Sequence, residues 1–408
     1  MKAGWQIKPI GEVCEVVNGG TPKTGTKEYW GGQHQWITPA EMGKRNSPYV
    51  GETERTVTDA GLQNSSARML PPYSVILSSR APIGHLVINT EPMATNQGCK
   101  GLVPSDPLHF KFLYYYLSSI VDLLNDLGSG ATFKELSGGK LKEVGIPFPS
   151  LPEQQRIVSI LDAAFDGIAT AKANAEQNLQ NARALFESHL RSVFNQRGEG
   201  WVEKSVGESV DEGILVKPFD GNHGEIHPTR ADYTESGVPF IMASDLVNGD
   251  VDTVHCKFIS RKLADSLRVG FAKDGDVLIS HKGTIGRSAI VSTADDYIML
   301  TPQVTAYRIK DHSKLLNRFI RYYFMSSEFQ QQIIDGAADG STRAYIGITK
   351  QLNLRFKFPS LDEQQKIVEK LDELVPETQR LEFLYQRKLA ALDELKKSLL
   401  HQAFSGAL

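Results

Sequence analysis

Apolar residues recur at helical spacing in two long stretches of this chain, residues 151–198 and 359–408. Steps of four and three residues, taken from Ile157 and from Ile367, meet mostly apolar side chains over about 35 residues, which is the pattern of a heptad seam. The first seam is rich in alanine and the second in leucine, so we expect the two helices to pack against each other. An antiparallel pair is favoured, because each intervening segment then lies at its own end of a rod about 65 Å long.

The starts of the two stretches repeat almost residue for residue. Residues 148–158 read FPSLPEQQRIV and residues 358–368 read FPSLDEQQKIV, an offset of 210 positions (358 minus 148). In each copy a serine is followed three residues later by a glutamate, Glu153 or Glu363, which predicts a capping box at a helix start. Repetition at this scale indicates that the chain consists of two related halves.

The segments between the repeats correspond more loosely. Residues 36–42 align with 240–246, residues 75–85 align with 277–287, and Met93, Thr95 and Gln97 align with Met299, Thr301 and Gln303. Alternating apolar residues predict short strands that begin near Val75, Leu86, Val277 and Ala289. The spacing of apolar residues predicts one amphipathic helix in residues 110–127 and another in residues 315–334.

These patterns predict an α/β fold with four parts. Two mixed α/β domains, residues 1–150 and 199–358, are separated by two long antiparallel coiled-coil helices, residues 151–198 and 359–408, in a pseudo-twofold internal repeat.

Composition narrows the class of protein but does not reveal its ligand. The 408 residues have a mean hydropathy of -0.28, with 40% apolar and 23% charged residues, which excludes a disordered or membrane-spanning chain. A net charge of -3 lacks the basic excess of most nucleic-acid-binding proteins. The cysteines Cys14, Cys99 and Cys256 are scattered and odd in number, and the first residues lack the apolar core of a signal peptide, so we expect a cytoplasmic protein.

Motifs for catalysis are weak. Pro71-Pro72-Tyr73 resembles a motif of amino-methyltransferases, but Leu70 stands where that chemistry needs Asn, Asp or Ser, and no glycine-rich cofactor loop follows an early strand. No phosphate-binding loop of the Gly-x-x-x-x-Gly-Lys-Ser/Thr type occurs in the sequence.

Signals for a nuclease or a metal site are equally weak. The Glu-x-Lys spacing at Glu394 falls inside a long predicted helix, where a solvated face is the simpler interpretation. His223 and His227 have the spacing of two zinc ligands on a helix, but Gly224 and Pro228 disfavour that helix. We therefore predict no metal site.

A variable domain followed by a long repeated helix, and then both again, resembles the specificity subunit of type I restriction-modification systems. The resemblance covers essentially the whole chain. It is carried by the doubled FPSLxEQQxIV segment, Gly4-Trp5, the turn at residues 19–22, the strand at residues 36–38 and the two hairpins at residues 78–85 and 280–287. The second domain departs from the pattern, because residues 217–223 replace the Gly-Gly-Thr-Pro turn.

The resemblance implies a non-catalytic subunit. Each variable domain would read one half of a bipartite, asymmetric site on double-stranded DNA, and the helices would set the spacing and dock two methyltransferase (modification) subunits. Adenine methylation, or cleavage together with restriction/translocase subunits, would then follow. The chain itself would need no cofactor, because S-adenosylmethionine, ATP and Mg would bind to the partner subunits.

Candidate DNA contacts are the cations and small polar residues of the hairpins and variable loops. In the first domain they are Lys23, Lys27, Lys44, Arg45, Ser79, Arg80, His85, Thr132 and Lys134. In the second domain they are Lys217, His223, Arg230, His281, Lys282, Arg287, Thr342 and Arg343. Candidate partner-binding and spacer residues are Glu153, Gln154, Gln155, Ile157, Leu161, Glu363, Gln364, Gln365, Ile367 and Leu371.

The balanced charge also predicts weak non-specific DNA binding by the isolated chain, because few counterions would be released. Nanomolar affinity for random DNA at physiological salt would contradict this prediction. A protein-binding scaffold with a coiled-coil spacer is the alternative function, and it predicts no sequence preference in a DNA selection.

Overall fold

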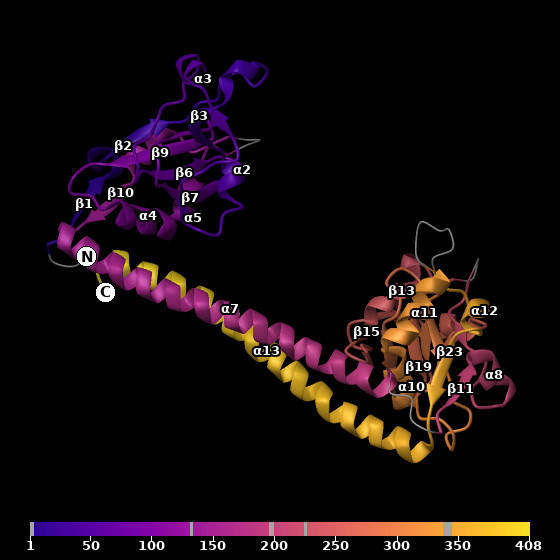
Figure 1. Ribbon diagram of the computed structural model, residues 1–408. Coiled ribbons are helices and arrows are strands. Elements are labelled where there is room, and N and C mark those ends of the chain that lie inside the picture. The colour runs from indigo at the N-terminus through magenta and orange to yellow at the C-terminus, as the bar shows by residue number, and fades with distance from the viewer. Residues whose placement is uncertain (1–3, 131–133, 196–199, 224–226, 338–344) are drawn as a thin grey trace. The chain divides into compact units, whose positions relative to one another are not determined.

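The computed structural model describes residues 4–130, 134–195, 200–223, 227–337 and 345–408 (Figure 1). The chain forms two compact units. The first unit comprises residues 1–176 and 386–408, and the second comprises residues 177–385. Each unit therefore contains one α/β domain, the beginning of one long helix and the end of the other.

The first unit is built on two sheets (Figure 1). The larger sheet has the strand order β2-β9-β6-β7-β4, and the smaller has the order β5-β3-β8. The strands are β2 (Cys14–Asn18), β3 (Trp30–Ile37), β4 (Tyr49–Val50), β5 (Thr56–Val57), β6 (Val75–Ser79), β7 (Ile83–Asn89), β8 (Met93–Thr95) and β9 (Cys99–Pro104). The pairs β4–β7 and β3–β8 are parallel, whereas the other pairs are antiparallel.

The second unit repeats this topology. Its sheets have the orders β12-β22-β19-β20-β16-β15 and β13-β17-β14-β21-β18. The strands are β12 (Phe219–Asp220), β13 (Tyr233–Thr234), β14 (Val238–Ile241), β15 (Leu246–Val247), β16 (Asp250–Val251), β17 (Lys257–Ile259), β18 (Phe271–Ala272), β19 (Val277–Ser280), β20 (Ser288–Ile290), β21 (Ile298–Leu300) and β22 (Val304–Tyr307). The parallel pairs β16–β20 and β14–β21 correspond to β4–β7 and β3–β8, which confirms the internal repeat.

Short helices complete both domains. In the first unit they are α1 (Ile10–Val13), η1 (Lys27–Tyr29), α2 (Pro39–Met42), α3 (Asp59–Gln63), α4 (Phe110–Ser119), α5 (Val121–Leu127) and α6 (Gly138–Glu143). In the second unit they are α8 (Val206–Asp211), η3 (Arg230–Asp232), η4 (Ala243–Asp245), α9 (Arg261–Ser266), α10 (Asn317–Phe324), α11 (Ser327–Ala337) and α12 (Ile348–Gln351). A two-stranded ribbon then leads into each long helix: β1 (Gln6–Pro9) with β10 (Gly145–Phe148), and β11 (Val202–Ser205) with β23 (Arg355–Phe358).

The long helices are α7 (Leu151–Asn195) and α13 (Leu361–Ser405), and they pack antiparallel (Figure 1). In the first unit the Lys172 ammonium lies 2.6 Å from the Asp393 carboxylate, and Leu161 shares a hydrophobic core with Ala403. In the second unit Arg183 pairs with Glu382 at 3.0 Å. The predicted antiparallel pairing is therefore confirmed.

The strict heptad is wrong, because burial along both helices follows an 11-residue step. The inward positions of α7 include Ile157, Ile168, Leu179 and Leu190, and those of α13 include Ile367, Thr378, Leu389 and Leu400. Leu185 and Leu395, both on the predicted heptad seam, are instead 50% and 46% exposed. An α-helix has 3.6 residues per turn, so a strict period of 3.5 drifts off the contact face, whereas 11 residues make just over three whole turns and return close to the same face.

Two further expectations need correction. Residues 110–127 and 315–334 each form two helices, which meet at Ile120 in the first unit and near Met325 in the second. The bend lets the later helix reach the neighbouring hairpin: the Asn125 amide donates to the Ile83 carbonyl at 3.3 Å, and the Gln330 amide donates to the Gly286 carbonyl at 2.9 Å. A single straight helix could not contact both the core of its domain and the neighbouring hairpin.

The alignment of residues 93–97 with residues 299–303 is wrong by one position. The Asn96 amide donates to the Ile37 carbonyl, and the equivalent bond in the second unit runs from Thr301 to Ile241. Thr301 is therefore the counterpart of Asn96, and Gln303 is the counterpart of Gly98. The alignment by sequence had paired residues of the same type, such as Met93 with Met299, which lie one position apart in the structural correspondence.

Within the described part of the chain, no helix combines the length and apolar character needed to cross a lipid bilayer. All three cysteines are free and buried.

Candidate nucleic-acid interface

The doubled glutamine of the repeat fixes each long helix to its own domain. Gln154 is fully buried; its side-chain oxygen accepts from the His109 amide at 2.9 Å, and its nitrogen donates to the Pro107 and Pro149 carbonyls at 3.2 and 3.0 Å. Because glutamine offers a donor and an acceptor on one planar group, a single side chain bonds three main-chain groups, one just before α7 and two just before α4.

Gln364 makes the same three bonds in the second unit. Its oxygen accepts from the Leu316 amide at 3.0 Å, and its nitrogen donates to the Lys314 and Pro359 carbonyls at 2.8 and 2.9 Å. Both glutamines were predicted as partner-binding or spacer residues, and the structure gives them an anchoring contact inside the chain.

A second repeated contact lies about two turns further along each helix. Asp162 accepts from the Lys111 ammonium and the Tyr115 hydroxyl, each at 2.6 Å. At the equivalent place, Asp372 accepts from Arg318 at 2.8 Å and from the Tyr322 hydroxyl at 2.6 Å. Burial, together with the bond to Asp372, raises the pKa of Tyr322 to about 12. Sequence reasoning missed both carboxylates, although the Leu-Asp pair of the repeat contained the signal.

The remaining predicted spacer residues divide by exposure. Ile157, Leu161 and Leu371 are buried in the cores of their units, and Ile367 packs against the edge of the second core. Glu153 pairs with Arg156 at 2.7 Å, and Glu363 accepts from the Trp201 indole at 3.1 Å. Gln155 and Gln365 are exposed, so these two predicted residues are accessible to a partner.

In the first unit the Gly-Gly-Thr-Pro turn carries the first predicted cations. A Cβ on Gly19 would lie 2.0 Å from the Asn96 carbonyl, and one on Gly20 would lie 2.2 Å from the Ala67 amide, so only glycine fits at either position. The buried Trp36 indole donates to the Gly20 carbonyl at 3.0 Å, and the Trp30 indole donates to the Lys23 carbonyl at 3.2 Å. The loop is therefore fixed by its main chain, while the side chains of Lys23 and Lys27 point to solvent.

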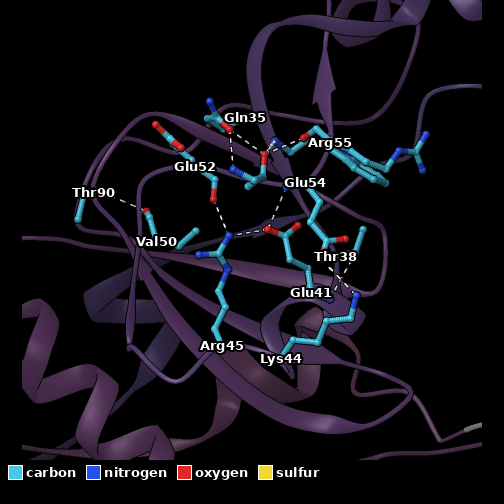
Figure 2. A network of polar contacts seen from close by, with 12 residues as sticks. Gln35, Thr38, Glu41, Lys44, Arg45, Val50, Glu52, Glu54, Arg55 and Thr90 are labelled. Atoms are coloured by element: carbon cyan, nitrogen blue, oxygen red, sulfur yellow. Dashed lines mark hydrogen bonds and ion pairs between the residues drawn. The ribbon is translucent and has the colours of Figure 1, made fainter.

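Lys44 and Arg45 belong to a polar network around the buried carboxylate of Glu41 (Figure 2). Glu41 accepts from the Arg45 guanidinium at 2.6 Å and from the Glu54 main-chain amide at 3.1 Å. Arg45 also donates to the Glu52 carbonyl at 2.5 Å, and Lys44 pairs with the Glu54 side chain at 3.2 Å. These bonds tie residues 44–54 to α2, so Arg45 serves the shape of the loop.

Arg55 is a surface cation that sequence reasoning missed. Its guanidinium lies 3.7 Å from the centre of the Trp30 ring, and Trp30 meets Trp36 edge to face at 4.9 Å. An exposed arginine held over an indole by a cation–π contact keeps its donors free for a ligand while its position is restricted. The pair of tryptophans in the first unit was the available signal.

The first hairpin places its predicted residues in different surroundings. Arg80 lies 3.8 Å from Glu135, and the same carboxylate lies 3.9 Å from Lys100, so two cations share one acid. Ser79 is fully buried and His85 is half-buried in β7. Lys134 is exposed, and Thr132 lies outside the described residues.

In the second unit, two predicted residues from distant segments meet. His223, Lys282 and Gln303 line one hollow of about 300 Å³, together with His227, Tyr233, Met242, Thr301 and Pro302. Lys217, Arg230 and Arg287 are exposed and are not part of this lining. Thr342 and Arg343 lie outside the described residues.

His281 lies beneath the surface, with 1% of its area exposed. Burial lowers its pKa to about 4, so the ring is neutral at neutral pH. The side chains of His281 and Ser79 therefore cannot contact a surface ligand in this conformation. We assign both residues a structural role beneath the surface. Among the described residues, no group of three or more histidine, cysteine or acidic side chains is arranged to hold a metal ion.

The chain thus contains two copies of one α/β domain. Each copy is fixed to a long helix by the same glutamine and aspartate, and each presents its own set of cations. This places the chain in the class of proteins built by duplication of a domain. The chain belongs to the family of the type I restriction modification DNA specificity domain, whose family model matches residues 2–181 and 219–384.

Several relatives and solved structures resemble the whole chain. The MjaIX specificity subunit of a type I restriction enzyme from Methanocaldococcus jannaschii is 28% identical, with 99% of this chain and 93% of that protein covered. The EcoBI specificity subunit from Escherichia coli is 24% identical over 83% of this chain and 74% of its own length. The fold is similar to that of the HsdS subunit from Thermoanaerobacter tengcongensis, with a TM-score of 0.61 and 18% identity over 100% of this chain and 98% of that chain. A chain from work on complex assembly and conformational transition of the type I R-M system gives a TM-score of 0.79 at 19% identity, with 100% and 99% covered.

Proposed function

We propose that this chain is the DNA sequence-recognition subunit of a type I restriction-modification complex, and that each α/β domain binds one half of a bipartite, asymmetric site. The observation that carries the proposal is a contrast within the repeat. The bonds that anchor each domain to its helix are the same in both units, at Gln154 and Gln364 and at Asp162 and Asp372. The surface residues at equivalent positions differ.

The differences are chemical. Arg80 in the first unit corresponds to Lys282 in the second, and Glu135 corresponds to Tyr345, because β-bridges link Arg80 to Glu135 and Lys282 to Tyr345. Gly98 corresponds to Gln303. Two domains with one fold and unlike contact groups are suited to two unlike half-sites, since base identity is read by donor and acceptor patterns.

We further propose that the paired helices set the distance between the half-sites and dock two methyltransferase subunits, with exposed residues such as Gln155 and Gln365 available to these partners. S-adenosylmethionine, ATP and Mg would bind to the methyltransferase and restriction/translocase subunits, and this chain would be non-catalytic and cytoplasmic. The names of the relatives support the role of specificity subunit.

A selection from random double-stranded DNA tests the proposal, with the full chain copurified with its methyltransferase subunit. The expected result is enrichment of two short blocks separated by a gap of fixed length and no preferred sequence. Recovery of random sequences by an assembled complex would contradict the proposal and favour the protein-binding scaffold.

Replacing Arg55 by alanine is expected to weaken binding to the selected site at least fivefold, a loss of about 1 kcal/mol, because an oriented donor group is removed. The preference for one block would relax and the other block would stay intact. The matched control is Arg68→Ala, which removes an arginine that pairs with Glu15 at 3.3 Å on the surface of the same unit. Equal losses for both variants in a binding titration would show that Arg55 has no special role.

A further inference from the structure

The hollow of the second unit is rich in hydrogen-bond donors. Its lining contains the Lys282 ammonium, the Tyr233 hydroxyl, the Gln303 amide and the rings of His223 and His227. Met242 and Pro302 supply the apolar part. No carboxylate is among the described residues that line it, so the surroundings favour an anion over a cation.

Two polar atoms of this lining are buried without a hydrogen-bond partner among the described residues. They are Thr301 Oγ1 and His227 Nδ1. Thr301 is only 4% exposed. Buried polar groups are nearly always paired, because each unpaired group loses its bonds to water and gains nothing in return. Such groups at the wall of an open hollow indicate that a ligand provides the missing partners.

The wall behind the hollow is itself fixed by a chain of hydrogen bonds. Gln351 accepts from the Tyr307 hydroxyl at 2.7 Å and donates to Thr305 Oγ1 at 2.9 Å. Thr305 Oγ1 also lies 2.6 Å from His281 Nδ1, a hydrogen bond whose direction depends on the tautomer of the ring. The other ring nitrogen of His281, Nε2, lies 3.7 Å from Asp220, too far for a hydrogen bond.

Asp220 is in turn occupied by His223, whose Nε2 lies 2.9 Å from the carboxylate. The carboxylate thus holds one ring nitrogen of His223, and the His223 side chain lines the hollow. The His223 ring is therefore positioned before a ligand arrives, which reduces the entropy lost on binding.

The first unit lacks this arrangement. Its Arg80 and Lys100 share Glu135 at 3.8 and 3.9 Å, whereas the residue equivalent to Glu135 in the second unit is Tyr345. The Lys282 ammonium lies 5.9 Å from the centre of the Tyr345 ring, a contact that leaves its positive charge without neutralisation by that residue. Among the described residues, the loss of this acidic partner therefore distinguishes the second domain from the first.

We infer that this hollow binds one phosphodiester group of the DNA backbone at the half-site of the second domain. The inference rests on the proposed function. Phosphates project from the ridges of the duplex and fit a concave, donor-rich site, whereas base edges lie at the floor of a groove about 8.5 Å deep and are reached by projecting side chains. The phosphate supplies acceptors for Lys282, Thr301 and the histidines, and it fixes the position of the domain on the duplex.

The test uses the full chain with its methyltransferase subunit and the duplex selected above. Lys282→Ala is expected to raise the Kd about tenfold and to make the slope of log K against log salt concentration shallower by about one, because one fewer counterion is released. Thr301→Val, which removes only the hydroxyl, is expected to weaken binding with an unchanged slope. The control Lys262→Ala alters an exposed lysine of α9 in the same unit and should leave both quantities unchanged. The selected sequence should be the same for all variants.

A scan with single neutral methylphosphonate linkages locates the contact. The wild-type complex should lose affinity at one linkage of the second half-site, and Lys282→Ala should show no further loss at that linkage. A relaxed base preference with an unchanged salt slope would show that the hollow reads a base, and wild-type affinity in both hollow variants would show that it does not touch DNA. Either result overturns the inference about the hollow, and the proposed function still stands if the wild type binds specific sequences. If the wild type shows no sequence preference, the proposed function itself is wrong.

Discussion

Gln364→Leu is expected to lower the free energy of unfolding of the second unit by about 3 kcal/mol. The substitution preserves the volume of the side chain but removes the partners of the Leu316 amide and of the Lys314 and Pro359 carbonyls. Each main-chain group left without a partner costs about 1–3 kcal/mol, and partial access of water keeps the sum near the lower end. The helix start would then separate from the domain that it anchors.

Hydrogen exchange followed by mass spectrometry provides the measurement, because it reports each unit separately. Protection should fall in residues 304–324 and 355–371 and should remain unchanged in the first unit. The adjacent Gln365 is exposed, so Gln365→Leu is the matched control and should change stability by less than about 0.5 kcal/mol. Gln154→Leu should produce the corresponding loss in the first unit. A loss of protection as large in Gln365→Leu as in Gln364→Leu would contradict the anchoring role.

Glu41→Ala is expected to destabilise the loop at residues 44–54 by about 2–3 kcal/mol and to impair recognition of one half-site only. The substitution leaves the Arg45 guanidinium without its carboxylate and the Glu54 amide without its acceptor (Figure 2). Removing one partner of a largely buried ion pair is costly, because the remaining charge has lost its compensation. Arg55, next along the chain, would lose its fixed approach to Trp30.

The control for this variant is Glu54→Ala. That side chain pairs with Lys44 at 3.2 Å on the surface, and such surface pairs contribute about 0–1 kcal/mol. Limited proteolysis should cut the loop faster in Glu41→Ala than in Glu54→Ala, and DNA selection should show one relaxed block in the former alone. If Glu41→Ala relaxed the sequence preference in both blocks, the network would support the whole chain and not only the DNA-binding surface of the first domain.

The repeat made the architecture predictable from the sequence. The doubled segment at residues 148–158 and 358–368 marked both helix starts, and the alanine-rich and leucine-rich stripes indicated the antiparallel pair. The period of the contact face was not predictable in this way, because heptad and 11-residue patterns share their first positions and separate only after Ala175. The partial burial of Leu179 and Leu389, together with the exposure of Leu185 and Leu395, decides between the two.

The site was predictable only in part. His223 and Lys282 were singled out from separate segments, and the fold brings them to one hollow. The burial of Ser79 and His281 was not predicted. A polar residue at or just after the end of a strand can face either inward or outward, and the sequence pattern does not distinguish the two cases. The buried Glu41 and the stacked Arg55 depend on contacts between α2, the loop and β3, which no local spacing rule describes.

The most direct test of the central claim is a genome-wide map of adenine methylation in a host that expresses this chain with its methyltransferase partner. The account predicts methylation within one motif of two unequal blocks separated by a constant gap. Glu41→Ala should then relax a single block and leave the other block and the gap unchanged. A contiguous motif, or methylation at background level despite an assembled complex, would contradict the claim that two related domains each read one half of a split site.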